Sequence, residues 1–310
     1  NFFDEMVTTT FDVISDVTFS DDEGFDRIGV HRAIDGYIAE AGKISLPDIL
    51  GFPDWVPRLS RIISGKALKQ MKALADQSID RRRDGKSKTP PDLLDLLLAG
   101  VDPKTQREMN TGELRDNLLT FIVAGHETTA LTLSWALYLL ANDDRVQDRA
   151  RQEVSEKVLT EQVQGEDIVN LKYLRSIIDE TLRLYPPAAL VSRTAAGPDN
   201  LCGREVRSGD TVIIPIYALH RHHTLWSRPD DFHPERFETD SPIERYAYLP
   251  FGDGPRVCIG ANFAINEAVI ILASLLKRFR FKPVAGLIPS PKMILTLRPE
   301  GGVWLVAEPI

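Results

Sequence analysis

Apolar residues recur at helical spacing through the first half of the chain. Four of them fall on one helical face near the start: Phe3, Val7, Phe11 and Ile14. The same criterion predicts helices over residues 25–40, 58–83 and 92–99, of which the second is basic and amphipathic. Three prolines within residues 44–57 predict an ordered loop there. The pattern therefore indicates a largely helical first half.

A long helix is expected after a loop at residues 101–110. Thr111 is its predicted N-cap, and the apolar pattern extends it to about Ala141, roughly 45 Å at about 1.5 Å per residue. Residues 124–129 place a glycine and four polar or ionisable side chains in its apolar middle. Glycine costs about 1 kcal/mol relative to alanine in a helix, and threonine hydrogen-bonds back to an earlier carbonyl. This stretch therefore predicts a local opening of the helix over a ligand.

In the second half of the chain, capping residues mark the predicted helices, and short segments of strand composition mark the predicted strands. Asp143 is the predicted N-cap of a helix ending near Lys157, and Asn170 is that of a helix over residues 171–184. Three later segments have the composition of strands: residues 190–195, 203–206 and 211–216. Near the C-terminus, residues 293–297 and 303–306 alternate around two glycines and predict a terminal hairpin.

Composition and charge narrow the class of protein. The 310 residues are 43% hydrophobic and 26% charged, as in an ordinary globular protein, and a formal net charge of −8 argues against nucleic acid as the main partner. The longest apolar run, residues 130–141, is too short to cross a bilayer, so no membrane span is expected. Two cysteines, Cys202 and Cys258, favour a reducing compartment over a disulfide scaffold. Because the chain starts at Asn1 without a signal-peptide pattern, we expect that N-terminal sequence is missing.

Cys258 lies in a segment rich in turn-forming residues. Glycines and a proline between Phe251 and Gly260 predict turns that deliver this cysteine to the start of an apolar helix ending near Arg278. Unpaired N–H groups and the helix dipole favour a thiolate there. A thiolate serves as a nucleophile, which needs an adjacent base, or as a haem ligand, which needs a flat neighbouring surface and a cation for the porphyrin carboxylates. Phe251 and Arg256 meet the latter needs, and a buried free cysteine is the alternative.

The order Phe-Gly-x-Gly-x-Arg-x-Cys-x-Gly, from Phe251 to Gly260, resembles the haem-binding loop of the cytochrome P450 family. The resemblance implies that the Cys258 thiolate is the metal ligand of a haem b group. The loop residues implied to bind this cofactor are Phe251, Gly252, Arg256 and Gly260. Arg193 lies where the family commonly places a cation for a haem propionate.

The sequence Ala124-Gly125-His126-Glu127-Thr128-Thr129 resembles the oxygen-binding groove of the same family. The resemblance implies that Ala124 and Gly125 leave room above the iron, whereas Glu127 and Thr128 relay protons to dioxygen. This role fits physically because cleaving an O–O bond requires proton delivery. The alternative is that Glu127 and Thr128 are solvated or locally capped. His126 occupies a variable position in the family, and we assign it no catalytic role.

Two further motifs bear on structure. Glu180 and Arg183 are three residues apart and share a helical face, and Pro234-Glu235-Arg236-Phe237 resembles a second family motif. The resemblance implies that Arg236 joins Glu180 and Arg183 in a buried ionic cluster supporting the cysteine loop.

A group of three histidines lies close together in the sequence. His220, His222 and His223 lack the cysteines or carboxylates of a zinc site, so a surface loop is predicted there.

The four motifs occur in the order of the family. They imply a mainly α cytochrome P450 fold with small β-sheets, in one haem-thiolate domain over residues 1–310 that represents the C-terminal portion of the family. The implied activity is a monooxygenase that activates dioxygen and oxidises a small to medium apolar organic substrate. No flavin or nicotinamide motif is visible, so electrons are expected from a ferredoxin or flavoprotein partner. The acidic composition favours a soluble, cytoplasmic enzyme of bacterial type.

Two alternatives remain open at this point. A peroxide-driven haem-thiolate enzyme has less need of the relay by Glu127 and Thr128. A haem-binding sensor, or a haem-free fragment without turnover, is the other alternative. The resemblance implies that the missing N-terminal part supplies further propionate contacts, so the fragment alternative is that the visible segment alone does not retain haem.

Overall fold

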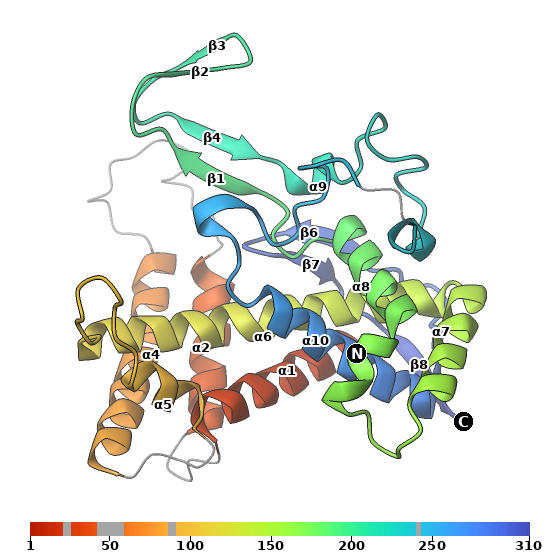
Figure 1. Cartoon of the computed structure of the whole chain (residues 1–310), viewed down its shortest axis with the longest axis horizontal. Coiled ribbons are helices and arrows are strands. Elements are labelled where there is room, and N and C mark those ends of the chain that lie inside the picture. Colours follow the sequence, from red (N-terminus) through yellow and green to blue (C-terminus); the bar gives the residue numbers. More distant parts are fainter. Residues whose placement is uncertain (21–25, 42–58, 86–90, 240–242) are drawn as a thin grey trace. The chain divides into compact units, whose positions relative to one another are not determined.

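The computed structural model describes residues 1–20, 26–41, 59–85, 91–239 and 243–310 (Figure 1). These residues form two compact units, one of residues 7–127 and the other of residues 1–6 and 128–310. The loop predicted at residues 44–57 lies outside the described residues. The single domain expected over residues 1–310 stays a prediction.

The unit of residues 7–127 is helical and encloses an apolar core. Its elements are most of α1 (Phe2–Phe19), α2 (Arg27–Ala41), α4 (Leu59–Asp84), α5 (Leu93–Leu98) and the first part of α6 (Thr111–Ala141). Each of these helices contributes to the core through a side chain at most 3% exposed: Phe11, Ile34, Met71, Leu94 and Leu118. The helices predicted from apolar spacing are therefore confirmed, and α1 is longer than predicted.

The N-terminus of α6 is capped by a residue that the sequence reading passed over. Asn110 Oδ1 accepts the Glu113 N–H at 3.0 Å, and Glu113 Oε2 accepts the Asn110 N–H at 2.9 Å. This reciprocal pair satisfies two backbone donors that have no partner within the helix. The predicted cap at Thr111 is therefore wrong by one residue, because Thr111 already belongs to the helix.

Helices also form the framework of the unit of residues 1–6 and 128–310. Beyond the second part of α6, they are α7 (Asp144–Lys157), η1 (Gly165–Asn170), α8 (Lys172–Leu184), α9 (Ile216–Leu219), η2 (Pro234–Phe237), η3 (Gly254–Arg256) and α10 (Ala261–Arg278). α10 packs against α7 and α8. The predicted cap of α7 is confirmed, since Asp143 Oδ1 accepts the Val146 N–H at 3.0 Å. Across the described parts of the chain, none of the helices has the length and apolarity needed to span a membrane.

The start of α8 is capped from another helix. Asn170 is the last residue of η1, so its prediction as the cap of α8 is wrong. Instead, the two carboxylate oxygens of Glu153 on α7 accept the N–H groups of Tyr173 and Leu174 at 2.8 and 2.9 Å. A carboxylate at this position satisfies orphan donors and favours the positive end of the helix dipole. The cap thereby ties α8 to α7.

Short antiparallel pairs make up the β structure of this unit. β1 (Val191–Thr194) pairs with β4 (Thr211–Ile214), and β2 (Asp199–Leu201) pairs with β3 (Arg204–Val206) to form the hairpin at the top of Figure 1. β5 (Phe279–Pro283) pairs with β8 (Leu305–Pro309), and β6 (Ser290–Met293) pairs with β7 (Leu297–Glu300). The predicted strands β1, β3 and β4 are confirmed, and β2 was missed.

The predicted terminal hairpin is wrong. Residues 293–297 contain the turn between β6 and β7, with Met293 and Leu297 paired at its two ends, and residues 305–309 pair with β5 instead of with β7. Alternation of polar and apolar residues identifies a strand but not its partner. The partner of β8 begins directly after α10, where the sequence reading expected no strand.

Candidate active site

Cys258 lies in a loop that is closed by its own backbone. The Cys258 N–H donates to the Phe251 carbonyl at 2.9 Å. Gly252 and Gly254 have φ values of +71° and +73°, in the left-handed region where a side chain would be strained. The sequence had placed Cys258 at the start of α10. The N-cap of α10 is Gly260, so Cys258 lies two residues before the cap, outside the helix. The turns of the loop therefore fix the position of the sulfur.

The surface around Cys258 is apolar and exposed. Val257, Ile259 and Phe263 are 52%, 86% and 38% exposed. The Cys258 thiol is free and exposed, and Arg256 on η3 is exposed as well. Exposed apolar residues that gather beside a functional group indicate a surface that a ligand covers. A soft sulfur donor, apolar neighbours and a cation together fit an iron porphyrin that carries carboxylates.

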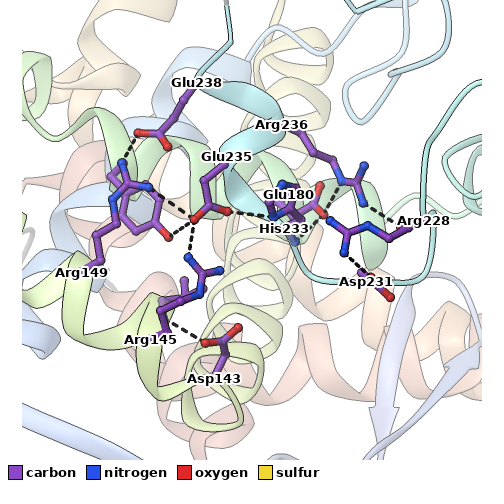
Figure 2. A network of polar contacts seen from close by, with 12 residues as sticks. Asp143, Arg145, Arg149, Glu180, Arg228, Asp231, His233, Glu235, Arg236 and Glu238 are labelled. Atoms are coloured by element: carbon purple, nitrogen blue, oxygen red, sulfur yellow. Dashed lines mark hydrogen bonds and ion pairs between the residues drawn. The ribbon is translucent and has the colours of Figure 1, made fainter.

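The structure brings Glu180, Arg183 and Arg236 together. Arg183 Nε and Nη2 donate to the two carboxylate oxygens of Glu180 at 2.7 and 2.8 Å, and Arg236 Nε donates to Glu180 Oε1 at 3.2 Å. The His233 N–H donates to the same oxygen at 2.9 Å (Figure 2). Because the side chains of Glu180 and Arg183 are both 0% exposed, this is a buried charged pair whose acceptor is shared by four donors.

The remaining N–H groups of the Arg183 guanidinium bind backbone carbonyls of the segment that precedes η2. Its Nη1 donates to the carbonyls of His220 and Pro229 at 2.9 and 2.6 Å, and its Nη2 donates to the Asp231 carbonyl at 3.1 Å. A guanidinium has five N–H donors, and all five are thus satisfied. The Trp226 ring lies 5.1 Å from the Arg183 Cζ atom and adds a cation–π contact.

A second set of charges ties η2 to α7. Glu235 Oε1 accepts hydrogen bonds from Arg145 Nη1 at 2.7 Å and from Arg149 Nη1 at 3.4 Å (Figure 2). Arg149 also pairs with Glu238 at 2.7 Å. Partial burial acts to raise the pKa of Glu235, but the hydrogen bond with Arg145 and the nearby positive charges lower that pKa to about 2. Glu235 is therefore ionised near neutral pH and holds η2 through charge.

The polar stretch in α6 does not open the helix. α6 is continuous from Thr111 to Ala141, so the predicted local opening is wrong. Gly125 gives clearance to α1, because a Cβ atom there would lie 3.3 Å from the Cγ1 and Cδ1 atoms of Ile14. His126 is 1% exposed, and its Nδ1 lies 2.7 Å from the Ile122 carbonyl one turn earlier. These local contacts are compatible with an unbroken helix.

The residues predicted to handle oxygen and protons are divided between the two units, because the chain passes from one unit to the other after Glu127. Ala124, Gly125 and Glu127 belong to the unit of residues 7–127, and Thr128 belongs to the other. Ala124 is exposed, whereas Glu127 is 3% exposed, so Glu127 is not a solvated side chain. The Thr128 carbonyl accepts a hydrogen bond from Thr132 Oγ1 at 2.9 Å. The relay by Glu127 and Thr128 stays a prediction.

The histidine-rich segment is only partly a surface loop. His222 and His223 are exposed as predicted, but His220 is 0% exposed, and for this residue the prediction is wrong. Burial lowers the pKa of His220 to about 4 despite opposing hydrogen bonds to backbone carbonyls. In the part of the chain that the structure describes, no group of three or more His, Cys, Asp or Glu side chains is placed to hold a metal ion.

Sequence comparison identifies the family. The profile of the family described as cytochrome P450 matches residues 1–306. The chain belongs to the cytochrome P450 family. The expected fold class, mainly helical with small β-sheets, is confirmed for this P450 chain.

Relatives of this P450 include plant and bacterial proteins. Cytokinin hydroxylase of Arabidopsis thaliana is 35% identical over 99% of this chain and 61% of its own length. Cyclooctatin synthase of Streptomyces melanosporofaciens is 32% identical over 98% of this chain and 67% of its own length. Bifunctional cytochrome P450/NADPH–P450 reductase 2 of Bacillus subtilis is 37% identical over 81% of this chain and 24% of its own length. The chain thus spans between about a quarter and two thirds of these relatives.

Arg193 of this P450 lies on β1, in register with Val212 of β4. Its side chain is exposed, and its Nη1 donates to the Ser192 carbonyl at 2.8 Å. Arg193 also lines a cavity of about 290 Å³ together with Thr194 and Val212. An exposed guanidinium on a strand edge is available for a carboxylate, but its pairing with a haem propionate stays a prediction.

Glu267 is a buried carboxyl that the sequence reading missed. It lies on α10, is 7% exposed, and its carboxylate oxygens make no hydrogen bond of standard geometry with another residue. Burial raises its pKa to about 7, against a smaller opposing effect of Thr129. The available signal was its place as the single ionisable side chain between Ala261 and Leu276.

Glu267→Gln is expected to change how stability depends on pH. A raised folded-state pKa means that the folded chain holds the proton between about pH 4.5 and 7 while the unfolded chain releases it, so stability is lost as pH rises through this window. The variant has no carboxyl and escapes this loss. The free energy of unfolding of the variant minus that of the parent should therefore be about 2–3 kcal/mol larger at pH 8 than at pH 4.5. Urea unfolding at both pH values measures this difference.

Glu205→Gln, at an exposed position on β3, is the matched control. Its stability relative to the parent should be the same at both pH values. If the free energies of unfolding of Glu267→Gln and the parent depend on pH in the same way, the pKa of Glu267 is not raised by folding.

Proposed function

We propose that this chain carries the haem-thiolate centre of a monooxygenase that oxidises a small to medium apolar organic substrate. The observation that carries the proposal is the loop of residues 251–258, which holds a free, exposed Cys258 among exposed apolar side chains. A haem held by a cysteine thiolate supplies the activation of dioxygen. The Streptomyces relative described as cyclooctat-9-en-7-ol 5-monooxygenase, 36% identical over 76% of this chain, supports this reaction class.

The chain offers residues for each part of the cofactor. Cys258 is the proposed ligand of the iron, and Phe251 is the proposed flat neighbour of the sulfur. Gly252 and Gly260 lack side chains, which lets the loop backbone lie close to a planar group. Arg256 and Arg193 are both exposed cations suited to the porphyrin carboxylates. Ala124 and Gly125 are proposed to leave room for oxygen.

Glu127 and Thr128 are proposed to deliver protons. Oxygen reduction consumes protons, and a hydroxyl next to a carboxyl group passes a proton without leaving a permanent charge beside the cofactor. The Thr128 hydroxyl is proposed to donate toward oxygen, and Glu127 is proposed to resupply it. The 3% exposure of Glu127 supports a role other than that of a solvated surface group.

Electrons are proposed to come from a separate ferredoxin or flavoprotein. The name of the Bacillus subtilis relative joins a cytochrome P450 to a reductase in one protein. That relative supports a flavoprotein as one candidate donor for this chain. Dioxygen and an apolar substrate complete the proposed set of reactants.

The carbon monoxide difference spectrum of the reduced protein tests the proposal. Haem-loaded protein is expected to show a strongly red-shifted Soret band, which marks a thiolate ligand. Cys258→Ala should abolish the red shift, because the sulfur is removed. Cys202→Ala, which removes the other exposed cysteine, should leave the band unchanged. A red-shifted band that survives in Cys258→Ala, or a parent protein that binds haem without it, would overturn the proposal.

A further inference from the structure

His220 lies between α8 and the cysteine loop. It follows α9 as its C-cap residue, and its side chain is fully buried. Its Nε2 lies 2.8 Å from the Leu249 nitrogen, and its Nδ1 lies 3.2 Å from the Arg183 carbonyl. The imidazole therefore bridges the end of α8 and the first part of the loop that carries Cys258.

The neighbours of His220 determine its tautomer. A backbone N–H only donates, so the Nε2 that faces Leu249 carries no proton and accepts. A carbonyl only accepts, so the Nδ1 that faces Arg183 carries the proton and donates. Arg183 Nη1 in turn donates to the His220 carbonyl at 2.9 Å, so each residue bonds the backbone of the other with its side chain. His220 is thus held rigidly as a neutral imidazole.

Leu249 links His220 to the backbone of the cysteine loop. Its carbonyl accepts the Gly252 N–H at 3.1 Å, and the Phe251 carbonyl accepts the Cys258 N–H at 2.9 Å. The preceding residue, Tyr248, donates its hydroxyl hydrogen to Asp179 on α8. The Tyr248 hydroxyl oxygen lies 2.9 Å from the Asp179 carbonyl oxygen and 3.0 Å from Asp179 Oδ1. Two consecutive residues at the base of the loop are therefore fastened to α8.

We propose that His220 is a positioning residue that anchors the Cys258 loop to the buried Arg183 and so holds the sulfur where it binds iron. This inference deepens the proposed function and rests on it for the role of the sulfur. Outer hydrogen bonds that orient a metal ligand typically contribute about 10–100-fold to metal affinity. His220 acts on the ligand loop through the backbone and not through the sulfur itself.

The surroundings of His220 keep the anchor in one protonation state. Burial is the main cause that disfavours a charged imidazole, and the cations of Arg183 and Arg221 add to it. The Tyr248 ring packs against His220, with 5.3 Å between the two ring centroids. Because the pKa is lowered to about 4, Nε2 remains an acceptor throughout the neutral range. A protonated ring would present an N–H to the Leu249 N–H and break the bridge.

Two substitutions separate anchoring from general stability. In His220→Gln the side-chain amide reaches the position of Nε2, so its oxygen can accept the Leu249 N–H. In His220→Asn the amide reaches only the position of Nδ1, so the contact with the Arg183 carbonyl is retained and the contact with Leu249 is lost. Both variants shorten or reshape the same buried side chain, which makes each the control for the other. His223→Asn, at an exposed position, controls for the change of residue type.

The first measurement is haem titration followed by the carbon monoxide difference spectrum. His220→Asn is expected to reduce the affinity that yields the red-shifted Soret band by about 10–100-fold, whereas His220→Gln stays within about threefold of the parent. The His223→Asn control should match the parent. If His220→Asn and His220→Gln lose the band to the same extent, or if His220→Asn keeps it fully, the anchoring role is refuted.

The second measurement needs no haem and separates this inference from the proposed function. Amide hydrogen exchange in the haem-free chain is followed for the peptide that contains residues 248–258. The exchange rate of the Leu249 amide should rise by about tenfold in His220→Asn and change little in His220→Gln. If this pattern holds but the parent shows no thiolate-bound haem, the anchor stands and the proposed function fails. Equal exchange in all variants refutes the anchor whatever the spectrum shows.

Discussion

Replacing Glu180 by glutamine is expected to lower the free energy of unfolding by about 3–5 kcal/mol. The substitution leaves the Arg183 guanidinium at 0% exposure without its counter-charge, and it turns one acceptor oxygen into an NH₂ group that faces other donors. Solvent cannot replace the lost interaction at a site with this burial. Urea unfolding of the haem-free chain at neutral pH measures the loss.

The exposed ion pair of Arg149 and Glu238 supplies the matched control. Its partners are 44% and 28% exposed, so Glu238→Gln should cost only about 0–1 kcal/mol. Arg236→Gln, which removes the outer member of the cluster, should fall between the two, because the Arg236 side chain is 11% exposed and Arg183 remains paired. If Glu180→Gln loses no more than Glu238→Gln, the buried cluster is not a source of stability. If Glu180→Gln fails to fold, the free energies of unfolding of Arg236→Gln and Glu238→Gln still compare the buried cluster with the surface pair.

Local sequence patterns were sufficient for the helices and for the cysteine loop. A helix repeats its contacts every three to four residues, so an apolar face such as that of α1 is visible without knowledge of the rest of the fold. The loop before Cys258 is similarly local, because Gly252 and Gly254 supply backbone conformations that other residues rarely adopt. These features are determined within about ten residues of chain, and for that reason a motif can reveal them.

Features that depend on distant partners were missed or misassigned. Glu153 caps α8 although it lies about twenty residues earlier and on another helix, so the nearby Asn170 was a reasonable but wrong choice. The strand β8 pairs with β5 across more than twenty residues, and alternation within β8 carries no information about that partner. Tertiary contacts decided both outcomes.

His220 and Glu267, two buried titratable groups outside the motifs, show the same limit of sequence-based prediction. His220 stands beside His222 and His223 in the sequence, and only packing against α8 separates the buried residue from its exposed neighbours. Glu267 was visible as a lone carboxyl on an apolar helix, yet its burial without a hydrogen bond of standard geometry appears only in three dimensions. The motifs point to the groups proposed to carry the chemistry, whereas the burial and the contacts of His220 and Glu267 come from the structure alone.

Thr128→Ala is expected to retain haem and the red-shifted Soret band while product formed per electron consumed falls on the order of tenfold, with hydrogen peroxide rising in proportion. The reason is that the proposed proton donor is lost while the ligand loop, built from residues 248–260, is untouched. Product, peroxide and reductant consumption measured in one reaction with an electron-donor partner give the coupling directly. Thr128→Ser keeps the hydroxyl and should recover most of the coupling.

Thr120→Ala separates loss of a proton donor from a change in the helix. Thr120 lies on α6, is exposed, and hydrogen-bonds the Asp116 carbonyl one turn earlier at 2.7 Å, so its replacement tests the effect of removing a threonine from this helix. Coupling in Thr120→Ala should equal that of the parent. If Thr128→Ala also matches the parent, the relay is wrong and protons reach oxygen by another route. If Thr128→Ala and Thr128→Ser are equally uncoupled, the position acts through its shape, because the hydroxyl is the group that distinguishes the two variants.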